Sequence, residues 1–156
     1  MADCIDTVVL TVGNSMMGDD GAGPYLTKLL EENPIDGWMV IDGGTIPENY
    51  VDKIVDIKPR QVIVVDATDM QLDPGELRVV DETLIADMFI MTTHSLPLTF
   101  LIEQLKAELE NVLFLGIQPD LVIFGLPMCD AVKATVESLH ARFTQWDGQQ
   151  GGIEAL

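Results

Sequence analysis

Residues 61–69 read Gln-Val-Ile-Val-Val-Asp-Ala-Thr-Asp, and this stretch decides the fold that the sequence predicts. It begins with an apolar, β-branched run that lacks the alternation of polar and apolar residues found in a half-exposed strand. Such a run is typical of a strand buried on both faces of a parallel sheet. Similar runs occur elsewhere in the chain, at Val8–Val12, Trp38–Ile41 and Val112–Leu115.

Helical patterns lie between these strands, at residues 24–32, 48–57, 98–109 and 131–146. A further short strand, Leu77–Val80, follows the turn signal Asp73-Pro74-Gly75 and is expected at a sheet edge. Strands that alternate with helices predict an α/β fold. We expect a three-layer sandwich in which a mostly parallel, twisted sheet of about five strands is flanked by helices.

Composition limits the class of protein. A chain of 156 residues, 47% of them hydrophobic, is large enough for one domain with a sizeable core. No long uncharged apolar run and no signal peptide is visible, so we expect a cytoplasmic protein. A formal net charge of −18 disfavours nucleic acid and anionic membranes as partners. That charge either serves solubility or attracts a basic segment or a metal ion.

Polar residues collect where the predicted strands end, and glycines accompany them. The first strand is followed by Asp19 and Asp20, the second by Asp42, the third by Asp66, and the last by Gln118. The carboxyl ends of parallel strands share one edge, where ligands bind in α/β proteins. We therefore predict a functional cluster of Asp20, Asp42 and Asp66, whereas Asp19 is expected to cap the following helix.

His94 lies on a predicted loop, where a metal ligand and an ordinary loop residue are equally compatible with the sequence. His140 lies within the last helix and is expected to have a packing or surface role. Carboxylates that share a crevice repel one another and favour a proton or a cation. Aspartates and one imidazole suit nickel or zinc, and so few ligands would leave positions open for a partner molecule.

Several common enzyme motifs are absent from the sequence. It has no HExxH helix, no GxSxG elbow and no Asp-Thr-Gly motif of ordinary aspartic proteases, and it lacks the GxGxxG pattern of dinucleotide-binding proteins. Cys4 and Cys129 form no CxxC pair, so we expect reduced thiols without a catalytic role. The residues alone indicate an acidic, metal-attracting crevice.

The stretch Gly-Asn-Ser-Met-Met-Gly-Asp-Asp-Gly-Ala-Gly-Pro at residues 13–24 resembles the [NiFe]-hydrogenase maturation endopeptidases, most of all their hydrogenase 3 branch. The similarity extends over nearly the whole chain, at residues 40–44, 47–49, 65–70, 91–94 and 114–120. It implies one protease domain over residues 1–156, with a loosely ordered tail at 148–156. Residues 124–129 depart most from the family pattern. This departure bears on which substrate is preferred and not on the chemistry.

The resemblance implies a monomeric endopeptidase of the aspartyl type. Its substrate would be a [NiFe]-hydrogenase large-subunit precursor, of hydrogenase 3 type, from which it removes a C-terminal extension after nickel insertion. In the family, the positions that match Asp20, Asp66 and His94 hold nickel, which the precursor would supply. Asp20, Asp42 and Asp66 are the predicted catalytic residues.

Two alternatives stay open at this point. A nickel-binding chaperone or checkpoint protein without proteolytic activity would carry the same metal-site residues. A metal-dependent hydrolase of small molecules would need no protein partner.

Overall fold

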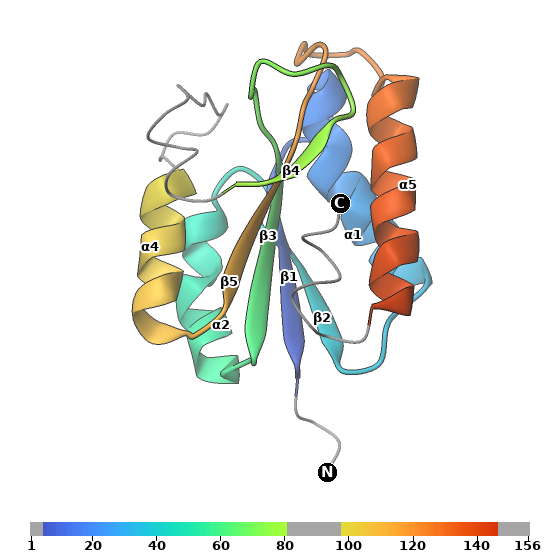
Figure 1. The fold of residues 1–156 in the computed structure, drawn as a ribbon. Coiled ribbons are helices and arrows are strands. Elements are labelled where there is room, and N and C mark those ends of the chain that lie inside the picture. The colour runs from blue at the N-terminus through green and yellow to red at the C-terminus, as the bar shows by residue number, and fades with distance from the viewer. Residues whose placement is uncertain (1–4, 81–97, 147–156) are drawn as a thin grey trace.

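A computed structural model describes residues 5–80 and 98–146, which are built around a five-stranded sheet (Figure 1). The strands are β1 (Thr7–Thr11), β2 (Trp38–Asp42), β3 (Gln61–Ala67), β4 (Leu77–Val79) and β5 (Val112–Ile117). They are arranged in the order β2-β1-β3-β5-β4. All neighbouring pairs are parallel except β4 and β5, which are antiparallel. The predicted α/β class and the edge position of the Leu77 strand are confirmed.

Helices and 3₁₀ turns lie between these strands, and one helix follows the last strand. They are η1 (Gly18–Gly21), α1 (Ala22–Glu32), η2 (Pro47–Tyr50), α2 (Val51–Ile57), α4 (Leu98–Glu108) and α5 (Asp130–Gln145). The helix predicted at residues 48–57 is divided into η2 and α2, and Tyr50 lies at the junction with φ −105° and ψ 0°. The other predicted helices are confirmed with slightly shifted ends.

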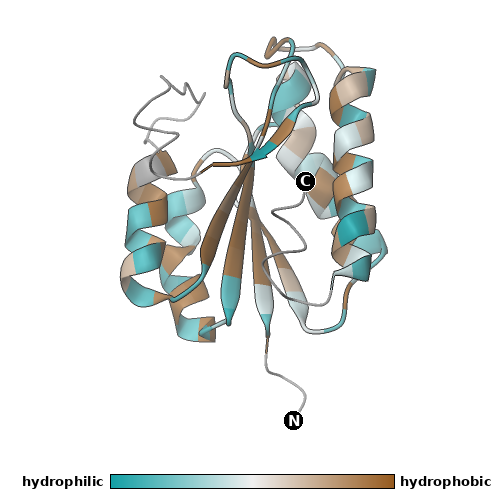
Figure 2. Ribbon diagram, in the orientation of Figure 1, coloured by the Kyte–Doolittle hydropathy of each residue, from teal (hydrophilic) through white to brown (hydrophobic). Residues whose placement is uncertain are grey.

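Each face of the sheet packs against a pair of helices. α1 and α5 cover one face, and α2 and α4 cover the other (Figure 1). The strands are hydrophobic along most of their length (Figure 2). Successive side chains of a strand point to opposite faces, so β3 contributes Val62 and Val64 to the α2/α4 core and Ile63 and Val65 to the α1/α5 core.

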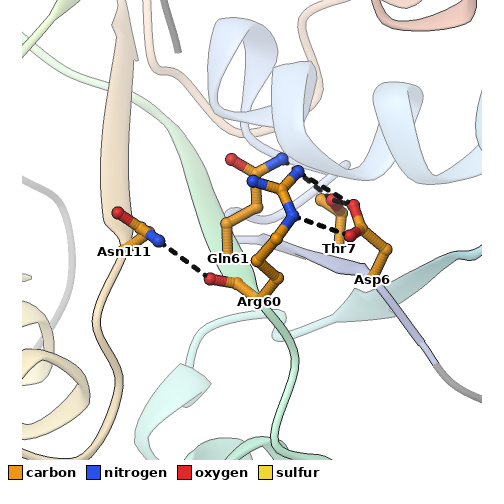
Figure 3. A network of polar contacts seen from close by, with 5 residues as sticks. All are labelled: Asp6, Thr7, Arg60, Gln61 and Asn111. Atoms are coloured by element: carbon orange, nitrogen blue, oxygen red, sulfur yellow. Dashed lines mark hydrogen bonds and ion pairs between the residues drawn. The ribbon is translucent and has the colours of Figure 1, made fainter. Parts of the chain in front are cut away.

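A polar network ties together the amino ends of the central strands (Figure 3). The Arg60 guanidinium donates to both carboxylate oxygens of Asp6, at 2.7 and 3.1 Å. Gln61 donates to Thr7 Oγ1 at 2.9 Å, and Asn111 donates to the Arg60 carbonyl at 3.2 Å. The hydrogen bond from Arg60 holds the pKa of Asp6 below its ordinary value. This network links the amino ends of β1, β3 and β5, opposite the strand ends predicted to carry function.

Some of the sequence predictions concern residues outside the described part of the chain. Among residues 5–80 and 98–146, no helix has the length and apolar character needed to cross a bilayer. The predicted tail at 148–156 lies outside the described residues, as does the His94 loop. The extent of one domain over residues 1–156 therefore stays a prediction.

Candidate functional site

The order of the strands defines where a ligand would bind. After β1 the chain passes through α1 to β2 on one side, and it then crosses back through α2 to β3 on the other side of β1. The two crossover helices lie on opposite faces of the sheet (Figure 1). Ligands of open α/β sheets usually bind at such a reversal, so the predicted crevice is expected beyond the carboxyl ends of β1 and β3.

Asp20 enters this crevice region on η1, the 3₁₀ turn that follows β1. Its side chain is 2% exposed, and its Oδ2 accepts a hydrogen bond from the Asn14 N–H at 2.9 Å. η1 also contacts β3. Gly13 makes this packing possible, because a Cβ at that position would lie 2.1 Å from the Asp20 carbonyl oxygen. The glycine thus lets the turn that carries Asp20 lie directly against the end of β1.

Asp66 lies near the end of β3 and is fully buried. Alternation along β3 assigns it to the same face as Val62 and Val64, the face covered by α2 and α4. It pairs in register with Gly116 of β5. Asp20 and Asp66 are therefore buried carboxylates, one just after β1 and one near the end of β3, the two strands at the reversal.

Asp42 has a different environment. It is the last residue of β2, it is exposed, and its Oδ1 accepts a hydrogen bond from the Gly44 N–H at 3.0 Å. It pairs with Thr11, on the face covered by α1 and α5. The structure thus places Asp42 at the predicted edge of the sheet but on the opposite face from Asp66.

Asp19 does not cap a helix, so that prediction was wrong. Its buried carboxylate instead accepts hydrogen bonds from the connection between β5 and α5: from the N–H groups of Asp120 (2.7 Å), Leu121 (3.3 Å) and Cys129 (2.7 Å), and from the Cys129 thiol (3.2 Å). These donors lie about a hundred residues away along the chain. Asp19 joins η1 to that connection.

Gln118 also has a structural role. Its side-chain carbonyl accepts hydrogen bonds from the N–H groups of Met70 (2.7 Å) and Leu72 (3.2 Å), and its amide donates to Asp69 at 3.2 Å. Gln118 therefore orders the loop that follows β3, close to Asp66. The sequence placed Gln118 correctly at a strand end but contained no signal of these partners.

The predicted metal ligands are only partly described. Within residues 5–80 and 98–146, no group of three or more His, Cys, Asp or Glu residues is placed so that it could hold a metal ion. His94 lies outside those residues, so the set Asp20, Asp66 and His94 stays a prediction. A hollow of about 470 Å³ between residues 73–78 and α5 is lined by none of the predicted site residues.

Asp20 and Asp66 are buried carboxylates that suit two kinds of chemistry. A carboxylate can serve as a general acid or base in hydrolysis. Two carboxylate oxygens are also suitable ligands for a divalent metal ion. The crevice is thus suited to hydrolysis or to metal recognition.

Comparison with known proteins identifies the family. The hydrogenase maturation protease family matches residues 24–146. The hydrogenase 3 maturation protease of Escherichia coli K12 is 51% identical over 144 residues, which cover 92% of each chain.

The chain belongs to the hydrogenase maturation protease family. It is accordingly a peptidase, as its relatives are.

Further relatives agree with this assignment. The protease is 31% identical over 148 residues to a putative hydrogenase maturation protease of Methanocaldococcus jannaschii, covering 89% of this chain and 86% of the relative. Its fold matches a crystal structure of a hydrogenase 3 maturation protease with a TM-score of 0.87 and 49% identity, covering 97% and 96% of the two chains. A maturation protease structure from Thermococcus kodakarensis matches with a TM-score of 0.78 at 26% identity, covering 90% and 91%.

Proposed function

We propose that this protease removes the C-terminal extension from the large-subunit precursor of a [NiFe]-hydrogenase of hydrogenase 3 type. The 51% identity to a protein named hydrogenase 3 maturation protease, over nearly the full length of both chains, supports this choice of substrate. The protease would act as a monomer in the cytoplasm, after nickel has been inserted into the precursor.

In this proposal nickel is part of the substrate, and Asp20, Asp66 and His94 recognise it. The observation that carries the proposal is the position of two buried carboxylates, on η1 and β3, at the edge where the strand order reverses. Carboxylate and imidazole ligands complement the softer ligands that a precursor can offer to nickel. Such an open ligand set is suited to a metal held mainly by the partner.

Cleavage would require water to attack the carbonyl carbon of the scissile peptide bond. A buried carboxylate of the Asp20 and Asp66 pair would accept the proton from that water, and the same proton would then pass to the leaving amine. Asp42 would order the backbone of the β2 turn through its bond to Gly44.

The decisive experiment is to incubate the protease with nickel-loaded and nickel-free precursor and to determine the mass of the products. We expect the loaded precursor alone to be shortened. A precursor that binds but keeps its full mass would favour the nickel-binding chaperone. Equal shortening of both forms would contradict nickel recognition while retaining the peptidase.

A further inference from the structure

Exposed large hydrophobic side chains collect beside the candidate site. We use the term apolar loop surface for five of them: Met16 (58% exposed), Leu121 (50%), Ile123 (48%), Phe124 (68%) and Leu126 (40%). Four of the five belong to the connection between β5 and α5, which carries hydrophobic residues at the carboxyl edge of the sheet (Figure 2). Exposed apolar side chains that are grouped together mark interaction sites, whereas scattered ones do not.

Backbone contacts join these residues into one surface. The Gly125 N–H donates to the Met16 carbonyl at 2.9 Å, and the Asp19 N–H donates to the Leu121 carbonyl at 2.9 Å. Gly18 adopts φ +59°, and a Cβ there would lie 2.5 Å from the Leu121 carbonyl oxygen. The loop after β1 and the connection after β5 therefore lie against each other.

Hydrogen bonds to the buried Asp19 carboxylate also hold the apolar loop surface in place. The Asp19 carboxylate accepts hydrogen bonds from Asp120 and Leu121 at the start of the connection and from Cys129 at its end. Hydrogen bonds to a charged acceptor are stronger than those between neutral groups. Both ends of the connection are thus fixed to the residue that precedes Asp20. A surface held in its final conformation loses less entropy when a partner binds.

Charge indicates what kind of partner fits. Residues 120–130 include the exposed carboxylates Asp120 and Asp130 and no Lys or Arg. With a net charge of −18, the chain repels a second copy of itself, anionic lipid and nucleic acid. A partner surface with apolar side chains at its centre and basic side chains around them would complement the apolar loop surface in both hydrophobicity and charge.

We propose that the apolar loop surface docks the hydrogenase large-subunit precursor, through an apolar patch of the precursor that is bordered by basic residues. This inference rests on the proposed function, because it takes that precursor as the substrate. Since Asp19 directly precedes Asp20, docking here would present the precursor to the crevice. The apolar loop surface would then determine which precursor is cut.

The test compares Phe124→Ser with Phe100→Ser. Each variant removes one exposed phenylalanine, and Phe100 is 51% exposed on α4, outside the apolar loop surface. For the nickel-loaded precursor, we expect Phe124→Ser to raise the Kd and KM about tenfold with kcat nearly unchanged, because an aromatic side chain is no longer buried on binding. Phe100→Ser should stay within about twofold of the wild type.

The controls separate this proposal from the proposed function. If wild-type protease leaves the loaded precursor at full mass, the proposed function fails, and the same binding measurement still tests the docking surface. If wild type cuts and Phe124→Ser binds and cuts equally well, the docking surface alone is wrong. Sedimentation of the wild type tests a second copy as the occupant: a dimer that Phe124→Ser dissociates would overturn the proposal. Unchanged melting temperatures would show that both variants are folded.

Discussion

Among single residues, exposure distinguishes the predicted catalytic carboxylates. Asp66 and Asp20 are buried, whereas Asp42 is exposed and shapes the turn after β2. Asp42 is held by the Gly44 N–H at an exposed turn, which suits a residue that positions the backbone. We therefore propose that Asp20 and Asp66 carry the chemistry and that Asp42 has a positioning role.

Two matched substitutions test this division. Asp66→Asn should lower kcat/KM for precursor cleavage by about a hundredfold or more, because a general base or a metal ligand is lost. Asp42→Asn should lower it less than about tenfold, since the amide oxygen can still accept the Gly44 N–H. Product masses over time provide the rates, and circular dichroism checks the fold. Equal inactivity of the two folded variants would contradict the division.

Cys129 provides a second test at the level of single residues. Burial raises the pKa of its thiol, and the Asp19 carboxylate raises it further by accepting the S–H and by its charge. A raised pKa in the folded state means that the stabilising contribution is complete below the ordinary value of 9.0 and is lost as pH rises through the folded value. At neutral pH the thiol is therefore protonated and slow to react.

We expect alkylation of Cys129 by iodoacetamide to be slower at pH 7.5 than that of a free thiol of ordinary pKa. The measurement uses a Cys4→Ser background, so that one cysteine is left. Asp19→Asn should accelerate alkylation and move its pH midpoint downward, because the negative charge next to the sulfur is removed. An unchanged midpoint in that variant would contradict the influence of Asp19.

Among the secondary-structure elements, η1 packs closely against the backbone at Gly13. Gly13 has φ +143°, a conformation that side-chain-bearing residues rarely adopt, and η1 packs against it through the Asp20 carbonyl. Gly44 has φ +58°, but a Cβ there would have no neighbouring atom within 4 Å. The two glycines therefore differ in steric contact, although both have positive φ.

This difference predicts unequal effects of alanine. Gly44→Ala should cost about 1 kcal/mol of unfolding free energy, the usual penalty for a left-handed alanine. Gly13→Ala should cost at least about 2 kcal/mol, because its Cβ also collides with the backbone of η1, and it should reduce activity by displacing Asp20. Urea unfolding and cleavage rates measure both effects. Similar losses in the two variants would contradict the packing described for η1.

The elements were largely predictable because the buried strands are apolar on both faces and end at glycines and aspartates. β1 and β3 follow that pattern. The role of Asp19 was not predictable, since its partners Asp120 and Cys129 are distant in sequence and local patterns report only local partners. The division between Asp42 and Asp66 also required the structure, because alternation assigns a face only once the helices that cover each face are known.

In the whole molecule, the polar network and the candidate site lie at opposite edges of the sheet. The Asp6–Arg60 network joins the amino ends of the strands (Figure 3). The buried carboxylates and the apolar loop surface lie at the carboxyl ends. The net charge of −18 affects both the stability of the fold and the attraction of a partner. Self-repulsion destabilises the folded state, while the same field attracts a partner with basic residues.

Salt should therefore have opposite effects on stability and on substrate capture. Raising NaCl from about 10 to 150 mM shortens the Debye length from roughly 30 to 8 Å, which screens both interactions. We expect the melting temperature to rise, because repulsion within the chain weakens. We expect kcat/KM for the precursor to fall, because attraction to its basic residues weakens as well.

A variant of lower net charge provides the control for the trend in melting temperature. Glu103, Glu108 and Glu110 are exposed on or just after α4, away from the apolar loop surface. Replacing all of them by Gln should raise the melting temperature at low salt and reduce its dependence on salt, because less repulsion is left to screen. If the melting temperature of the triple variant depended on salt as strongly as that of the wild type, self-repulsion would not be the cause of that dependence. If kcat/KM did not change with salt while the melting temperature rose, the precursor would be recognised without its basic residues, and apolar contact alone would account for docking.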